Sequence, residues 1–170
     1  MKETWIAQSF ILIGYLIFFA SRFKNMKKGM LITDNISRIC FATGYILFRS
    51  VNGIEHTAYG IVRNIVAQYI SKKSRLQKWL YFAVMFALLM IMYGKSFAGI
   101  PTIMLWGSAV INLITAFFMQ EQEIRLGTFL AAICNVVAFM MLSSYASVLG
   151  EGVCGVIGIV SYINGKRQDA

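Results

Sequence analysis

Residues 100–119 read IPTIMLWGSAVINLITAFFM, an unbroken run without a charged side chain. A helix needs about 20 mostly apolar residues to cross a bilayer, so this run predicts a membrane-spanning helix. Six further mostly apolar runs lie before and after it, and some of these contain charged residues. They are Trp5–Phe19, Gly29–Phe48, Ile54–Ile70, Trp79–Tyr93, Ile124–Leu142 and Ala146–Ile163. The sequence therefore predicts an all-α membrane protein with seven transmembrane helices.

The composition supports this class. Of the 170 residues, 58% are hydrophobic and only 14% are charged, whereas soluble domains average about 45–50% apolar and about 25% charged residues. Seven spans with short connections use nearly the whole chain, which leaves no room for a soluble domain. The net charge of +9 is explained by basic loops between spans, so we expect the lipid bilayer as a partner and no nucleic acid.

Basic residues collect at alternate ends of the predicted spans. Placing the N-terminus outside and the C-terminus inside puts most of them on the inner face, as the positive-inside rule requires. The inner residues are then Arg22, Lys24, Lys27, Lys28, Lys72, Lys73, Arg75, Lys78, Arg125, Lys166 and Arg167, and the outer ones are Lys2, Arg49 and Lys95. An odd number of spans is needed for this topology, and seven satisfies it.

A weak internal repeat relates the two halves of the chain at an offset of about 97 residues. It places Gly29 near Gly127, Gly53 near Gly150 and Glu55 near Glu151, and a threonine near the start of each half also matches. We therefore expect residues 1–72 to form a first three-helix bundle, 73–97 a linker helix and 98–170 a second bundle. Because the linker reverses the chain, the two bundles are parallel, a repeat class known in transporters.

Three charged residues fall inside predicted spans. Asp34 and Arg38 lie four residues apart on one helical face, and Arg63 lies near the middle of the next span. Isolated in a bilayer, three such groups cost roughly 7–10 kcal/mol at about 2.5–3.5 kcal/mol each, so they must face one another, a bundle interior or water. Two readings stay open: a structural ion pair between the spans, or a positively charged cavity for a small anionic or zwitterionic solute.

Other polar residues are candidates for the same solute site. Asn64 follows Arg63, and Trp106, Asn112 and Asn135 lie within spans of the second half. Asparagines from one repeat and arginines from the other could line a single cavity from opposite sides. The alternative is that the asparagines only form hydrogen bonds between membrane helices, which contribute about 0.6–2 kcal/mol.

The sequence offers little for catalysis. The single histidine, His56, has no HExxH context and no nearby serine and aspartate to form a nucleophilic site. Cys40, Cys134 and Cys154 are scattered through apolar runs without metal-ligand spacing. We therefore expect no catalytic residues, no metal site, no cofactor and no enzymatic activity.

Two motifs carry a resemblance to a known family. The opening Trp5-Ile6-Ala7-Gln8 and the segment His56–Asn64 (HTAYGIVRN) resemble the bacterial inner-membrane YgjV family over essentially the full chain. This resemblance implies a place among the triple-helix-bundle membrane proteins that include the SWEET sugar facilitators and the PQ-loop transporters. It further implies a three-plus-one-plus-three architecture, a central cavity and the bacterial inner membrane as location.

The chain departs from these relatives at two points. It contains no Pro-Gln dipeptide, and its single proline, Pro101, stands at the start of span five, so the proline hinges of SWEET-type proteins do not transfer. Glycine also occupies position 60, where the family pattern places asparagine.

Together these features favour a small-solute transporter or facilitator with a midplane site between the two repeats. A non-transporting membrane receptor or accessory subunit on the same scaffold is the alternative. The identity of the solute stays open, and a homo-oligomer is compatible with the sequence.

Overall fold

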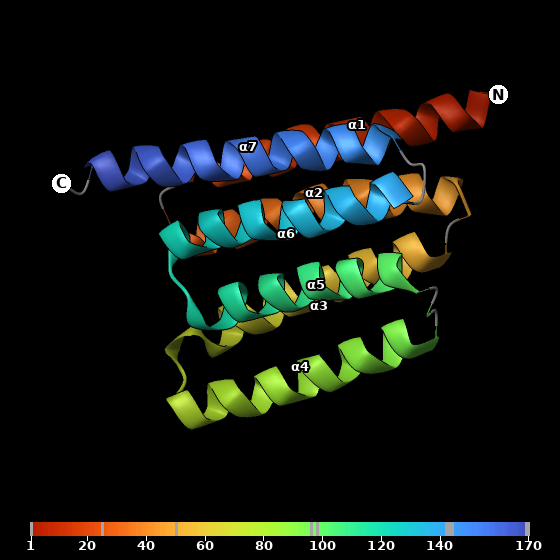
Figure 1. The fold of residues 1–170 in the computed structure, drawn as a ribbon. Helices are drawn as coiled ribbons and strands as arrows, with labels where there is room; N and C mark the ends of the chain where they lie inside the picture. The colour runs from red at the N-terminus through yellow and green to blue at the C-terminus, as the bar shows by residue number, and fades with distance from the viewer. Residues whose placement is uncertain are drawn as a thin grey trace. The chain divides into compact units, whose positions relative to one another are not determined.

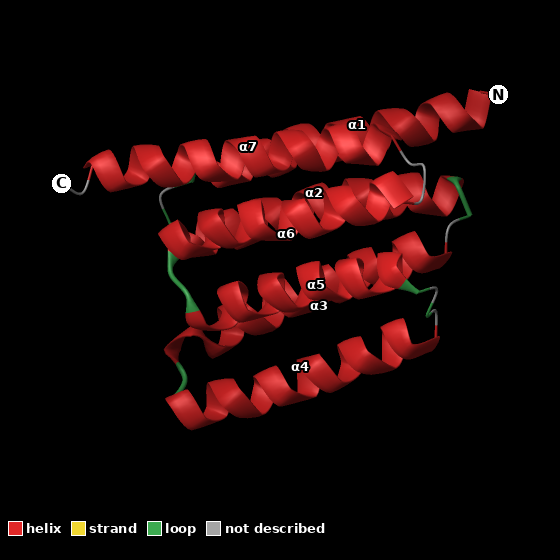
Figure 2. Cartoon of the chain, viewed as in Figure 1, coloured by secondary structure: helices red, strands yellow, loops and turns green. Residues whose placement is uncertain are grey.

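The computed structural model describes residues 2–24, 26–49, 51–95, 97, 99–141 and 145–168, and all regular structure within these ranges is helical (Figures 1 and 2). The α-helices are α1 (Lys2–Arg22), α2 (Lys27–Leu47), α3 (Val51–Tyr69), α4 (Arg75–Lys95), α5 (Ile100–Phe118), α6 (Glu121–Met141) and α7 (Tyr145–Gln168). A short 3-10 helix, η1 (Ile70–Lys72), follows α3. The predicted all-helical fold is therefore confirmed.

Each of the seven predicted runs coincides with one α-helix, and the boundaries differ by only a few residues. Leu142, the predicted end of the sixth run, lies outside the described residues. The same holds for the side chains of Lys2, Lys166 and Arg167, which entered the topology prediction.

Polar residues at the helix starts explain why two helices begin before their apolar runs. At α4, the backbone N–H of Ser74 donates to Oε1 of Gln77, and the N–H of Gln77 donates back to the Ser74 hydroxyl oxygen. This reciprocal pair is a capping box. At α6, the backbone N–H of Gln120 donates to Glu123 Oε2 over 2.9 Å. Both caps satisfy backbone donors that a helix start leaves open.

The chain forms two compact units, Met1–Tyr69 and Ile70–Ala170. In the first unit α2 packs against both α1 and α3, and in the second unit α6 packs against both α5 and α7 (Figure 1). Helix α4 packs on α5 through aromatic rings, with Trp79 and Phe118 centroids 4.6 Å apart. A side chain on the middle helix α2 is thus able to contact two neighbouring helices at once.

Glycines allow α7 to approach α6 closely. A Cβ atom added at Gly158 would lie 2.9 Å from the carbonyl oxygen of Arg125 and 3.2 Å from the amide nitrogen of Phe129. One added at Gly155 would lie 3.1 Å from the Cβ of Ala132, whereas one at Gly152 would meet nothing within 4 Å. Close packing through small residues, a common feature of membrane helices, therefore rests on Gly158 and Gly155.

Within the described part of the chain, five helices are long and apolar enough to cross a membrane: α1, α4, α5, α6 and α7. Helices α2 and α3 are not among these candidates. They are the helices that carry Asp34, Arg38 and Arg63 within their lengths. The predicted number of seven spans thus depends on how these two polar helices satisfy their charged side chains.

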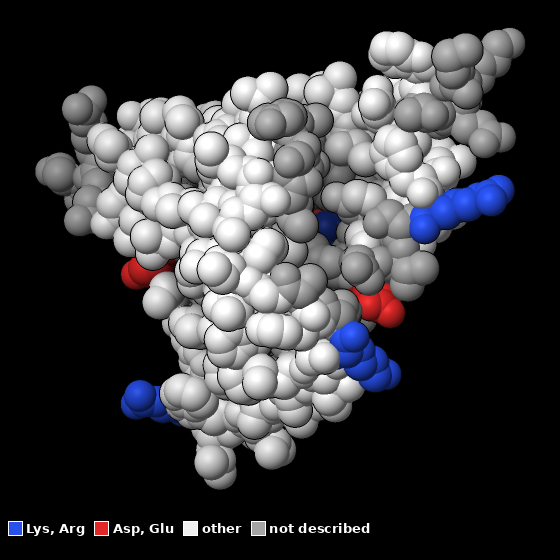
Figure 3. All heavy atoms as spheres, turned by 45° about the vertical axis from the view of Figure 1, so that its right-hand side comes forward, with Lys and Arg blue, Asp and Glu red and all other residues white. Residues whose placement is uncertain are grey.

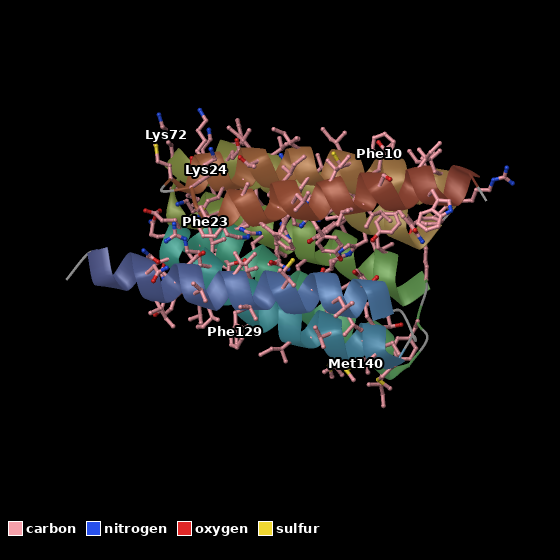
Figure 4. The ribbon with its side chains drawn as sticks, turned by 90° about the horizontal axis from the view of Figure 1, so that it is seen from above. Phe10, Phe23, Lys24, Lys72, Phe129 and Met140 are labelled. Atoms are coloured by element: carbon pink, nitrogen blue, oxygen red, sulfur yellow. The ribbon has the colours of Figure 1, made fainter. Side chains whose placement is uncertain are left out.

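Large apolar side chains cover the outside of the candidate spans. Leu12 on α1, Ile91 on α4, Met140 on α6 and Val156 on α7 are each about 60% exposed. In the space-filling view uncharged atoms make up most of the visible surface, and only a few Lys, Arg, Asp and Glu side chains stand among them (Figure 3). In the stick view Met140 and Phe129 project outward from α6 (Figure 4). A surface of this kind is suited to lipid chains, because the exposure of so much apolar area to water is unfavourable.

Candidate polar site around Asp34

A single buried carboxylate organises the first unit. Asp34, on the middle helix α2, is only 2% exposed, and three guanidinium groups converge on it. Arg38 Nε lies 3.2 Å from Asp34 Oδ2, Arg63 Nη2 lies 3.6 Å from the same oxygen, and Arg22 Nη2 lies 3.9 Å from Oδ1. The arginines come from α2, α3 and the last turn of α1 in turn, so the site is built by all three helices of the unit.

Asn64 links the charged groups to one another. Its Nδ2 donates to Asp34 Oδ2 over 2.5 Å and to Asn35 Oδ1 over 3.0 Å. Its Oδ1 accepts hydrogen bonds from Nε and Nη2 of Arg63, over 3.1 and 2.8 Å. Because both ends of the amide are used, Asn64 fixes the distance between the arginine and the carboxylate. We call Arg22, Asp34, Arg38, Arg63 and Asn64 the Asp34 cluster.

The Asp34 cluster holds more positive than negative charge. Three arginines and one aspartate leave an excess of two positive charges among its members. A buried ion pair is costly to desolvate and is retained only when hydrogen bonds satisfy its remaining groups. Asp34 Oδ1 has no hydrogen-bond partner among the described residues. Within the cluster, Asp34 Oδ2 thus accepts hydrogen bonds from Arg38 and Asn64, whereas Oδ1 has only the Arg22 guanidinium nearby.

Arg38 is the most accessible arginine of the cluster. Its side chain is 14% exposed, whereas those of Arg22 and Arg63 are each 6% exposed. Its guanidinium lies against Gly60 of α3, where an added Cβ would collide with Nη1. The glycine therefore provides the space that the tip of Arg38 occupies.

The structure thus brings together four of the predicted site residues: Asp34, Arg38, Arg63 and Asn64. Arg22 and Asn35 also contribute to this site and were not predicted from the sequence. Arg22 was assigned to a basic loop, but it is 5% exposed and its guanidinium stacks 4.2 Å from the centre of the Phe18 ring. A signal for this was its position only three residues beyond the end of the first predicted span, Trp5–Phe19, and close in sequence to the start of the second.

The remaining predicted residues, Trp106, Asn112 and Asn135, belong to the second unit, and no described contact joins them. Asn135 Nδ2 donates to Glu151 Oε2 on α7 over 2.9 Å. Trp106 lines an apolar pocket between α4 and α5, 6.0 Å from the Phe86 ring. Asn112 is half-buried on α5, and its backbone carbonyl oxygen accepts a hydrogen bond from the Thr115 hydroxyl.

A second buried arginine lies in the second unit. Arg125, expected as an inner loop charge, is 6% exposed within α6. Its Nη1 donates to Gln122 Oε1 over 3.2 Å and to the backbone carbonyl of Ser161 on α7 over 3.3 Å. Arg125 therefore ties α6 to α7.

The apolar helices, their exposed apolar surface and the buried charged cluster together define an all-α integral membrane protein. Residues 5–169 match the profile of the Imp-YgjV family, described as bacterial inner membrane protein, and the chain belongs to this family. The predicted family is thereby confirmed. Searches of curated proteins and of solved structures found no match.

Proposed function

We propose that this protein is a multi-pass transporter or facilitator for a small anionic or zwitterionic solute, and that the solute binds at the Asp34 cluster. The observation that carries the proposal is the convergence of three arginines, one each from α1, α2 and α3, on the buried carboxylate of Asp34. Charged groups inside a membrane protein are expensive and commonly mark solute or ion pathways. An arginine fork suits carboxylate or phosphate, because its planar donors bind such groups bidentately.

In this proposal all seven helices cross the membrane in a three-plus-one-plus-three arrangement of the SWEET and PQ-loop type. Helices α2 and α3 cross despite their polarity, because Asp34 accepts a hydrogen bond from Arg38 and Asn64 accepts two from Arg63 within the first unit. The N-terminus lies outside and the C-terminus inside, as the distribution of basic residues favours. The protein catalyses no reaction, and its role is to bind and move the solute.

A thermal-shift screen of the purified protein against small metabolites tests the proposal, run beside Arg63→Gln. Arg63 donates two hydrogen bonds to Asn64, so its loss disturbs the cluster. We expect a solute that raises the melting temperature of the wild type and not of the variant. That solute is then expected to cross liposome membranes that contain the protein. Binding without flux would instead support a receptor or accessory subunit, and absence of any stabilising solute would favour a purely structural ion-pair cluster.

A further inference from the structure

We propose that the solute is an organic oxyanion without an ammonium group. Its oxygens accept hydrogen bonds from Nη1 and Nη2 of Arg38, whose guanidinium lies against Gly60. This inference rests on the proposed function and names the class of solute at that site. Three observations support it: how Arg38 is oriented, which of its donors remain unused, and how the carboxylate of Asp34 is occupied.

The orientation of Arg38 is set within α2. Its Nε donates to Asp34 Oδ2 over 3.2 Å, one turn earlier on the same helix. Across the described ranges of the chain, this is the one hydrogen bond and ion pair of Arg38. Its Nη1 and Nη2 groups therefore have no acceptor among these described residues, although they are good donors. Nη1 and Nη2 form one edge of the planar guanidinium, and such an edge binds the two oxygens of a carboxylate or phosphate in parallel.

Access to this edge depends on Gly60. An added Cβ at this position would overlap Nη1 of Arg38, so any larger residue displaces the guanidinium. Arg38 also retains more exposure than the other two arginines of the cluster. Arg38 is consequently the arginine of the cluster that a solute is best able to reach.

The rest of the cluster disfavours an ammonium group. Asp34 Oδ2 already accepts hydrogen bonds from Arg38 and Asn64 and lies 3.6 Å from Arg63 Nη2. The opposite oxygen has Arg22 at 3.9 Å. An ammonium group near this carboxylate would approach three guanidiniums, and like charges repel strongly where little water is present. A zwitterionic amino acid is thus a poorer fit than a simple acid anion.

The test measures binding of four small probes to the purified full-length protein by isothermal titration calorimetry. Propionate carries the oxyanion alone, L-alanine adds an ammonium group, and propionamide is the neutral counterpart of propionate. Inorganic phosphate distinguishes a phosphate site from a carboxylate site. We expect propionate or phosphate to bind about tenfold or more tightly than L-alanine and propionamide, because only the oxyanions satisfy the paired donors without added positive charge.

Two variants probe the donor edge. Arg38→Lys keeps the charge and removes the planar fork, and Gly60→Ala keeps every charge and displaces the guanidinium. Each is expected to weaken oxyanion binding about tenfold. Gly152→Ala is the matched control, because a Cβ there meets nothing within 4 Å, and it is expected to bind as the wild type does. If Arg38→Lys does not fold, Gly60→Ala still tests the geometry.

The outcomes separate this inference from the proposed function. Equal binding of L-alanine and propionate, or unchanged oxyanion binding in folded Gly60→Ala, would overturn the inference and leave a solute site in place. If neither propionate nor phosphate binds while the metabolite screen finds a stabilising solute, the inference also fails and the proposed solute site remains. If neither the probes nor any metabolite binds, both proposals fail.

Discussion

Replacing Asp34 with asparagine removes one negative charge and keeps the shape of the side chain. In the folded protein this carboxylate lies 3.2, 3.6 and 3.9 Å from nitrogens of three guanidiniums. Asparagine offers one oxygen that accepts a hydrogen bond, but it neutralises none of the arginines. Removing one partner of a buried ion pair costs about 3–5 kcal/mol. We therefore expect Asp34→Asn to lower the free energy of unfolding by about 3–5 kcal/mol.

Unfolding by sodium dodecyl sulfate in mixed micelles, followed by circular dichroism, measures this loss. Glu55→Gln is the control for the charge change, because Glu55 is exposed at the start of α3, and it is expected to change stability by less than about 0.5 kcal/mol. Adding Arg38→Gln to Asp34→Asn removes one excess cation and is expected to recover part of the loss. If Asp34→Asn is no less stable than Glu55→Gln, the carboxylate does not hold the arginines together and the description of the cluster is wrong.

Other variants test the packing and the topology. Gly158→Ala places a Cβ against the backbone of α6 and is expected to cost about 1–3 kcal/mol, whereas Gly152→Ala stays within about 0.5 kcal/mol of the wild type; equal stabilities would contradict the close α6–α7 contact. Asn135→Ala breaks its 2.9 Å hydrogen bond to α7 and is expected to lose about 0.6–2 kcal/mol in the same unfolding assay, and no loss would show that the bond is not formed. In a background without native cysteines, Ser74→Cys is expected to react with an impermeant maleimide only from the inner face and Phe97→Cys only from the outer face, and the reverse pattern would contradict the proposed topology.

The positions of the helices could be predicted from the sequence because long apolar runs specify them directly. The seven runs coincide with seven α-helices, and their exact ends depend on caps such as the one at Ser74 and Gln77. Segment length and polarity are local properties, so they are readable without knowledge of packing. The polarity of α2 and α3, which separates them from the five apolar helices, is likewise visible in the sequence.

The candidate site could be predicted only in part. The neighbouring positions of Asp34 and Arg38 follow from helical spacing, and the sequence analysis also placed Arg63 with them. The role of Arg22 could not be found this way, because a basic residue at a helix end looks the same whether it faces water or a carboxylate on the next helix. The bond between Asn135 and Glu151 was also missed, since only the packing of α6 on α7 brings these residues together.

Uptake into proteoliposomes tests the proposed role of the Asp34 cluster most directly. The solute is the one that stabilises the wild-type protein best, and the wild type is compared with Gly60→Ala after both are shown to be folded. We predict saturable uptake by the wild type and a loss of about tenfold at low solute concentration in the variant. Equal uptake by the two proteins would contradict a solute site at the tip of Arg38, and no uptake by the wild type would contradict transport itself.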